Sequence, residues 1–375
     1  MEFINQGKSM VKYLKKDKIY EHLRREIMSE VLPPGSKLPR EVLLAKRLGV
    51  SHVTLRSSLA RLASEGLIDR VHGVGNFVSA VAKHRAYLLI LPDQIDLVES
   101  PSRYVIEGVE EKAQEKGCSL EKCPASWLAQ FNSDDYSRMI KTHHIQGIIY
   151  ETAHAIPDPQ ITALLKELPL PVVIPHGGIF DAEKTGFLVL RTNERNAFAD
   201  ALRYLIGLGH RRIATVLVRI PGEETSLIRG FREGELIDFY RYNGLEAGEH
   251  LIRVLDNNAE QFSLTARELM LGPTPPTAFV CHSDRVAMRI FSTLKELNIL
   301  IPQEVSIMGY NNYSGCQLLE PALCTVDTEL KECGKMALEK LIAADDWYQP
   351  GITPQEILTP YKIIERDSVR KITHS

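Results

Sequence analysis

The feature that most constrains the fold is an alternation of short apolar runs and amphipathic segments, which continues over most of the chain beyond residue 86. Runs of a few apolar residues fit buried strands, whereas apolar residues spaced three and four apart fit helices. Strands that alternate with helices predict a doubly wound, parallel α/β sheet. Roughly 290 residues are more than one such sheet usually needs, so we expect two lobes.

The expected strands are Tyr87–Leu91, Ser119–Lys122, Gly147–Tyr150, Val172–Ile174, Gly186–Leu190, Ile213–Val218, Ala278–Cys281 and Val305–Met308. The expected helices lie near 103–117, 134–143, 160–168, 194–207, 226–242, 260–271, 284–297 and 329–343.

The first 80 residues follow another pattern. A helix over 17–30, a second over Arg40–Leu48 and a third from Ser51 to about Ser64 precede two short apolar runs around a glycine-containing tip. Gly49 suits the end of the second helix and Ser51 suits the start of the third. Three helices followed by a hairpin predict a winged helix-turn-helix. We therefore expect a DNA-binding domain over 1–80, a linker over 81–86 and a two-lobed domain over 87–375.

The charge of the chain is divided along the same line. Residues 1–85 contain 16 Lys and Arg against 8 Asp and Glu, a net charge of +8, and the rest of the chain carries −11. A basic module on an acidic body favours contact between that module and a polyanion such as duplex DNA.

The third helix is the expected recognition helix, because the second helix of a helix-turn-helix enters the major groove with its N-terminal residues against base edges. Leu55, Leu59 and Leu62 are spaced to face the core, which leaves the opposite face for DNA. The predicted DNA contacts on this helix are Ser51, His52, Thr54 and Arg56, with Arg56 suited to a guanine or a phosphate and the hydroxyls to phosphate oxygens or base edges. At the hairpin tip, His72 and Gly73 are expected at the minor groove or the backbone.

Residues 38–78 closely resemble the winged helix-turn-helix of GntR-type regulators. The matching pieces are Leu38-Pro39, Leu48-Gly49-Val50-Ser51, Thr54-Leu55-Arg56, Leu62, Glu65-Gly66-Leu67-Ile68 and Gly73-x-Gly75-x-Phe77-Val78. The resemblance implies binding of double-stranded operator DNA by a homodimer. Where that family often has an arginine this chain has Val42, and Arg40 is the candidate to replace it.

The body resembles the periplasmic-binding-protein-like cores of LacI/GalR repressors over roughly 86–368. The matching pieces are Tyr204-Leu205-Ile206-x-x-Gly209-His210-x-x-Ile213-Ala214, Arg229-Gly230-Phe231, Pro276-Thr277-Ala278, Ser283-Asp284-x-x-Ala287, Val305-Ser306-Ile307-x-Gly309-Tyr310, Pro321-x-Leu323-x-Thr325-Val326 and Ile363-Ile364-Glu365-Arg366-Asp367-Ser368. A GntR-type head on such a body is the arrangement of arabinose-repressor-like regulators. The resemblance implies two lobes, an N-lobe of about 86–185 plus 310–325 and a C-lobe of 186–309 plus 326–345, which close over a sugar-like effector.

The positions that bind effector in that family are changed here. The sequence has His176 and Asn311 where the family commonly has aspartates, and Ser283 where it has an asparagine. Its usual arginine is Leu227, and Arg229 lies two residues further on. His176, Ser283, Asn311 and Arg229 are the candidate effector contacts, and the changed charges predict a ligand that differs from the common sugars or a cleft that has lost its effector. Asp284 is expected to cap the helix that follows it.

No catalytic or metal motif accompanies these features. The six cysteines are scattered, away from zinc spacing, and fit reduced thiols of a cytoplasmic protein, and the N-terminus does not resemble a signal peptide. We expect no cofactor, no metal, no membrane span and no enzyme activity. Two alternatives are a GntR-type head on a pyridoxal-phosphate aminotransferase-like body and a secreted transport protein.

Overall fold

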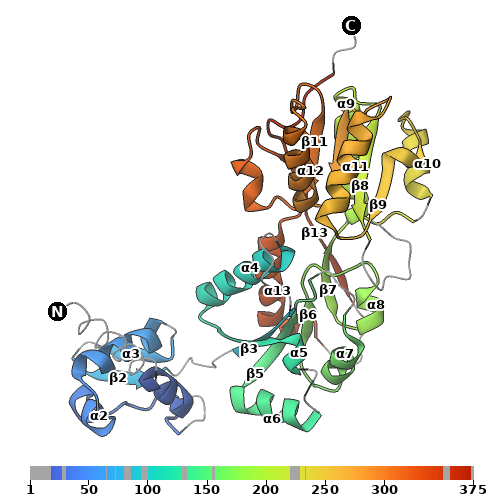
Figure 1. Ribbon diagram of the computed structural model, residues 1–375. Helices are drawn as coiled ribbons and strands as arrows, with labels where there is room; N and C mark the ends of the chain where they lie inside the picture. The colour runs from blue at the N-terminus through green and yellow to red at the C-terminus, as the bar shows by residue number, and fades with distance from the viewer. Residues whose placement is uncertain are drawn as a thin grey trace, which may run out of the picture.

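The computed structural model describes residues 18–27, 31–64, 66–71, 73–79, 86–93, 100–128, 130, 133–153, 157–219, 229–232, 234–348 and 355–372. Figure 1 shows a small head beside one end of a body made of two stacked lobes. Among the described residues, no helix has the length and apolar character needed to span a membrane.

The head is the expected winged helix-turn-helix. A helix over 18–27 precedes α2 (Glu41–Arg47) and α3 (His52–Ser64), and the wing pairs β1 (Ile68–Val71) with β2 (Gly75–Val78) in antiparallel register. Leu55, Leu59 and Leu62 are fully buried, as their spacing predicted. They form one core with the other apolar residues of the head, Ile19, Tyr20, Leu23, Ile27, Leu38, Leu44, Ala45, Leu67, Ile68 and Val78.

The lobe next to the head, here the N-lobe, contains a parallel sheet in the order β13-β7-β6-β5-β3-β4. Its strands are β3 (Ala86–Leu91), β4 (Ser119–Pro124), β5 (Ile145–Tyr150), β6 (Val172–Ile174), β7 (Leu188–Thr192) and β13 (Glu356–Thr359). Its helices are α4 (Pro101–Lys116), α5 (Ala125–Leu128), α6 (Ser133–His143), α7 (Pro159–Lys166), α8 (Asp181–Thr185) and α13 (Leu330–Ile342), with η3 (Ala344–Asp346) after α13.

The other lobe, the C-lobe, has the sheet order β14-β12-β11-β10-β8-β9, parallel except for β14. Its strands are β8 (Ile213–Val218), β9 (Ile252–Leu255), β10 (Ala278–Cys281), β11 (Ser306–Tyr310), β12 (Cys324–Asp327) and β14 (Lys362–Ile364). Its helices are α9 (Glu194–Gly207), α10 (Glu235–Tyr242), α11 (Ala259–Leu271) and α12 (Asp284–Glu296), with η1 (Glu249–Leu251) and η2 (Ser314–Leu318).

Successive residues of the central strands serve opposite faces of each sheet, because side chains in a strand alternate in direction. In β3, Leu88 and Ile90 join the core on one face, whereas Tyr87 and Leu89 join the core beneath α13. A strand covered by helices on both faces has no polar side, which explains the unbroken apolar runs in the sequence.

The expected division of the chain between the lobes was wrong in its third segment. Residues 310–325 stay in the C-lobe through β11 and β12, whereas α13 packs on the N-lobe against α4, β5 and β6. The strand expected at Gly186–Leu190 is β7, two residues later, and it lies in the N-lobe sheet. The helix expected over 226–242 begins only at Glu235, and residues 226–228 lie outside the described part of the chain.

Two glycines allow α4 and α13 to cross at very short range. A Cβ on Gly108 would lie 1.9 Å from the Lys331 carbonyl oxygen, and one on Gly334 would lie 2.0 Å from the Val105 carbonyl oxygen. The backbones therefore touch where a side chain would normally separate them.

The described parts of the three units are joined by specific side-chain contacts. Tyr104 of α4 stacks on Tyr313 of the C-lobe, with ring centroids 5.4 Å apart and an interplanar angle of 6°. The Tyr104 hydroxyl accepts from the Ser314 amide at 2.7 Å and donates to the Ser314 Oγ at 3.2 Å. From the head, Arg24 donates to Ser119 Oγ at 2.9 Å and to Glu121 Oε1 at 3.1 Å, both on the edge strand β4.

Candidate DNA-binding groove and effector cleft

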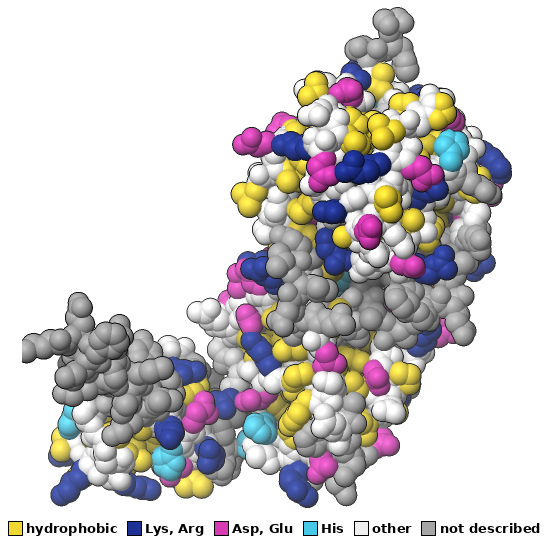
Figure 2. All heavy atoms as spheres, in the orientation of Figure 1, with side chains coloured by type: hydrophobic (Ala, Val, Ile, Leu, Met, Phe, Trp, Pro, Cys, Tyr) yellow, Lys and Arg dark blue, Asp and Glu magenta, His cyan; other side chains and the backbone are white. Residues whose placement is uncertain are grey.

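A groove of about 910 Å³ runs between the recognition helix α3 and the wing. It is lined by the segment before α2, the first turn of α2, one residue of α3 and the wing, namely Lys37, Leu38, Pro39, Arg40, Glu41, Arg56, Arg70, Val71, Gly73, Val74, Gly75 and Asn76. Four of these side chains are cationic and one is anionic. In Figure 2, Lys and Arg side chains also lie along the lower edge of the head.

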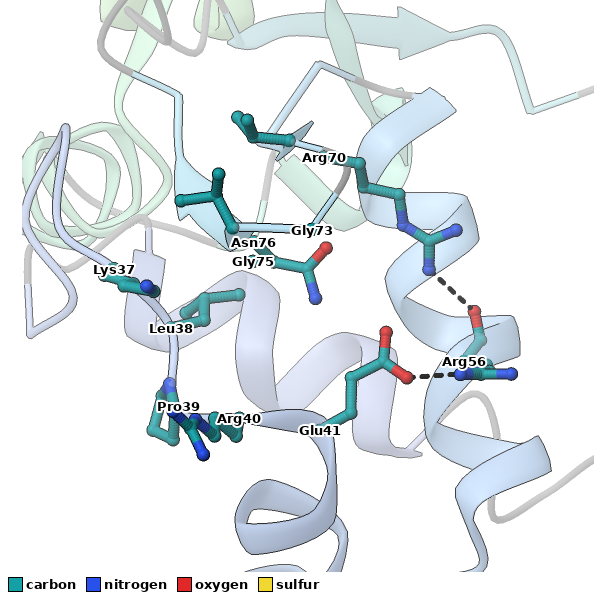
Figure 3. Close-up of a pocket in the computed structure, with 12 residues that line it drawn as sticks. Lys37, Leu38, Pro39, Arg40, Glu41, Arg56, Arg70, Gly73, Gly75 and Asn76 are labelled. Atoms are coloured by element: carbon teal, nitrogen blue, oxygen red, sulfur yellow. Dashed lines mark hydrogen bonds and ion pairs between the residues drawn. The ribbon is translucent and has the colours of Figure 1, made fainter.

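Arg56 lies on the exposed face of α3 and is held by one carboxylate. Its Nε donates to Glu41 Oε2 at 2.7 Å, and its side chain is still 71% exposed. The hydrogen bond from Arg56 lowers the pKa of the Glu41 carboxyl, so Glu41 is ionised at neutral pH. Figure 3 shows Glu41 pointing from the start of α2 to Arg56. This pair orients the guanidinium and leaves donors available to an incoming ligand.

The start of α3 is fixed by two hydroxyls. Ser51 Oγ accepts from the Thr54 amide at 3.2 Å, which makes Ser51 the N-cap of the helix, and the two side-chain oxygens lie 2.7 Å apart. Thr54 is only 7% exposed and its hydroxyl lies against Ser51 Oγ, so the described structure adds no support to the predicted DNA contact at Thr54, which stays a prediction. Ser51 and His52 are exposed on the predicted face, and Val53 beside them is 65% exposed.

The wing approaches the same groove from the other side. Gly73 has a φ of +75° at its tip, a conformation that favours glycine, and the Val74 amide donates to the Val71 carbonyl at 3.0 Å. Arg70 NH2 donates to the Arg56 carbonyl at 3.4 Å, which ties the wing to α3. Arg40 is exposed at the N-cap position of α2. The predicted contact at His72 lies outside the described residues.

Sequence reasoning did not single out Lys37, Arg70 or Asn76, which also line the groove. Lys37 pairs with Phe77 through an isolated antiparallel bridge at the edge of the wing. The two-residue period of the wing strands could have found Arg70 and Asn76, because they are register partners in the hairpin.

Three of the four candidate effector residues, His176, Ser283 and Asn311, lie just beyond strand ends, and the four side chains are held in different ways. Ser283 caps α12, with its Oγ accepting from the Val286 amide at 3.5 Å. Asn311 donates to the Tyr313 hydroxyl at 3.0 Å and accepts from Thr328 Oγ1 at 3.2 Å. Arg229 is 6% exposed and contacts Glu194 and the His282 carbonyl. His176 is 5% exposed, with a φ of +50°.

Asp284 is not the cap that the sequence suggested, because Ser283 occupies that position and Asp284 is the first residue of α12. Its buried carboxylate accepts from Thr325 Oγ1 at 2.6 Å and from the Tyr313 amide at 2.7 Å. Burial raises the pKa of Asp284 to about 6, although these hydrogen bonds oppose the shift. Asp284 thus holds the loop after β11 that carries Asn311 and Tyr313.

No group of three or more His, Cys, Asp or Glu side chains in the described ranges is arranged to hold a metal ion. None of the six cysteines, all within the described residues, forms a disulfide, and five of the six are buried. Scattered, mostly buried thiols were the prediction from the sequence.

The head and the body match different family models. Residues 15–78 match the bacterial regulatory proteins of the gntR family, and residues 202–369 match the periplasmic binding protein-like domain. The arabinose metabolism transcriptional repressor of Geobacillus stearothermophilus is 26% identical over 367 residues, covering 94% of this chain and 98% of that protein. The HTH-type transcriptional repressor PurR of Shigella sonnei is 28% identical over 268 residues, covering 71% of this chain and 75% of that protein.

Solved structures share the fold of the body. A regulatory protein of the LacI family from Chloroflexus aggregans superposes with a TM-score of 0.61 and 20% identity, covering 76% of this chain and 98% of that chain. The LacI family regulator CCPA of Weissella paramesenteroides, with bound sucrose, gives a TM-score of 0.58 and 19% identity, covering 77% of this chain and 100% of that chain.

Proposed function

We propose that this chain is a cytoplasmic transcription repressor controlled by a small molecule, because residues 15–78 match the gntR family of regulators and residues 202–369 match a periplasmic binding protein-like domain. The head binds operator DNA as part of a homodimer, and a sugar-like effector between the lobes changes its affinity. The proposal includes no catalytic step. The relative that represses arabinose metabolism and the sucrose-bound regulator support a sugar-like effector.

The observation that carries the proposal is the groove beside α3, where Lys37, Arg40, Arg56 and Arg70 face one space. Phosphate contacts position a DNA-binding protein, and side chains at the start of the recognition helix read base edges. The aminotransferase-like alternative is not retained, since residues 202–369 match a periplasmic binding protein-like domain.

Binding to DNA from upstream of the gene is expected to fall steeply with salt. If the four groove cations each neutralise a phosphate, one head loses about 100-fold in affinity between about 50 and 200 mM salt. A gel-shift titration across that range measures the slope. Affinity that does not change with salt would exclude the proposed head function.

Coupling between the proposed effector site and the DNA-binding head requires an element that contacts both lobes. Asn311 contacts Tyr313, Tyr313 stacks on Tyr104, and α4 follows the strand β3 that emerges from the head. Val105 of α4 also belongs to a C-lobe core. A ligand that prefers one arrangement of the lobes would shift this contact, and so bias the heads of a dimer.

Replacing Tyr104 with phenylalanine is expected to keep the stack and remove both hydrogen bonds to Ser314. We expect the free energy of unfolding to fall by about 1 kcal/mol, and operator affinity to change by a few-fold as the lobe arrangement loosens. Thermal unfolding and gel shift measure the two effects. Tyr242→Phe, at a tyrosine 92% exposed on α10, is the matched control. If the unsubstituted, Tyr104→Phe and Tyr242→Phe proteins bound operator with equal affinity, coupling through Tyr104 would be ruled out.

A further inference from the structure

A pocket of about 390 Å³ lies at the C-terminal ends of β4, β3 and β5, three neighbouring strands of the N-lobe sheet. It is lined by Pro92, Asp93, Ala125, Ser126, Tyr150, Glu151, Thr152, Asp158 and Ile161. The C-terminal edge of a parallel sheet is where open α/β folds bind ligands. The sequence prediction named no residue of this pocket as a site residue, although Asp93, Glu151 and Thr152 lie within two residues of the ends of expected strands.

The charged side chains in the described lining of the pocket have one sign. Three carboxylates line it, and the described lining residues include no Lys, Arg or His. Asp93 Oδ1 accepts from the Ser126 amide at 3.1 Å, and Asp158 Oδ1 accepts from the amides of Gln160 and Ile161 at 2.8 and 3.0 Å. These donors are neutral, so they orient the Asp93 and Asp158 carboxylates without cancelling their charge.

Two further lining residues are buried and polar. Glu151 has no exposed surface, and its Oε1 accepts from Ser102 Oγ at 2.9 Å and from the Ala153 amide at 2.8 Å. Thr152 is 8% exposed, and its hydroxyl has no hydrogen-bond partner within the part of the chain that the structure describes. Buried hydroxyls are normally paired, because an unpaired one costs free energy. The Thr152 hydroxyl is therefore a second sign, independent of the carboxylates, that a ligand completes this pocket.

We propose that this pocket is the part of the effector site that selects a small polyhydroxylated ligand bearing a protonated amino group, and that it rejects phosphorylated ligands. The inference rests on the proposed effector function and names the chemistry of the effector. An ammonium group donates to the carboxylates that line the pocket, and a ligand hydroxyl pairs with Thr152. A phosphate would place its negative charge among these carboxylates, and no cation among the described lining residues would balance it.

Calorimetric titration of the full chain with D-glucosamine, D-glucose and D-glucose 6-phosphate tests this, at a pH below the pKa of the amine. D-Galactosamine and D-galactose repeat the comparison on a second ring. We expect at least one amino sugar to bind about tenfold more tightly than its neutral counterpart, as a charge-assisted hydrogen bond provides, and the phosphate ester to bind more weakly than glucose.

Two variants place the effect in the pocket. Asp93→Asn keeps an acceptor for the Ser126 amide but removes the charge, so it should abolish most of the preference for the amine. Thr152→Val removes the unpaired hydroxyl, so it should raise the Tm of the ligand-free protein. It should also weaken binding of the amino sugar about fivefold. Asp238→Asn is the control, because Asp238 is an exposed α10 carboxylate of the C-lobe paired with Arg241.

Three results would each overturn the inference. They are tighter binding of glucose 6-phosphate than of glucose, binding of both amino sugars no tighter than of their neutral counterparts, and equal effects of Asp93→Asn and Asp238→Asn on the preference for the amine. Gel shift on the same protein separates this failure from that of the proposed function. If the protein binds DNA in a salt-dependent way but shows no preference for the amine, the proposed regulator function stands and only the proposed ligand class is wrong. If the protein does not bind DNA, the proposed regulator function itself is wrong.

Discussion

Replacing Arg56 with alanine is expected to weaken operator binding about 10- to 100-fold, the cost of one good base contact or several phosphate contacts. Arg56 is the groove cation at the start of the recognition helix, and Glu41 fixes its direction. Because its side chain is largely exposed, the substitution removes few packing contacts, and we expect the thermal stability of the chain to change little.

The lysine variant of the same residue distinguishes the two kinds of contact. A phosphate needs only the positive charge, so Arg56→Lys would retain most of the affinity, whereas a guanine needs the two-pronged guanidinium. Arg241→Ala, at an exposed arginine on α10, controls for the change in net charge. Gel shift with operator and with scrambled DNA measures affinity and specificity. An Arg56→Ala protein that binds operator as tightly as Arg241→Ala would remove Arg56 from the interface.

Alanine at Gly108 is expected to destabilise the body by about 3 kcal/mol, because the new methyl group would overlap the Lys331 carbonyl of α13. A backbone carbonyl cannot rotate away as a side chain can, so the helices must separate. The reciprocal change at Gly334 would meet the Val105 carbonyl and should cost a similar amount. Urea unfolding measures both.

Gly207→Ala is the matched control for this pair. Gly207 is the last residue of α9, and a Cβ there would meet no atom within 4 Å. Alanine at Gly207 should therefore be neutral or stabilise the chain by up to about 1 kcal/mol, since it favours the helix. If Gly108→Ala were as stable as Gly207→Ala, α4 and α13 would not be in backbone contact in solution.

The sequence predicted most strands that are buried on both sides and missed three of the four edge strands. The central strands β3, β5, β6, β7, β8, β10 and β11 were found because they are short apolar runs, whereas the missed β9, β13 and β14 are edge strands that are not fully buried. Two strands depart from this rule, since the edge strand β4 was predicted and the buried central strand β12 was missed. The exchange of the third segment between lobes could not be predicted, because local pattern shows that 330–342 is a helix and does not show which sheet it covers.

The DNA-binding groove was more predictable than the effector cleft for a similar reason. Residues of the recognition helix are placed by the period of one helix, so the spacing of the leucines predicted the exposure of Arg56 and His52. The candidate effector residues come from segments that are far apart in the chain. A resemblance locates positions such as Asn311 and Arg229, but only the structure shows that their side chains bind Tyr313, Thr328 and Glu194.

The interleaving of the two lobes also limits how such a protein can change by gene recombination. The N-lobe sheet draws on residues 86–192 and 356–359, and the C-lobe sheet on 213–327 and 362–364, so one breakpoint inside the body would divide the parts of a lobe between two parents. The head, in contrast, draws all of its described residues from one part of the chain, between residues 18 and 79. Recombination just beyond the head can therefore join a different DNA-binding domain to an intact two-lobed domain. The separate family matches of the head and the body agree with such recombination.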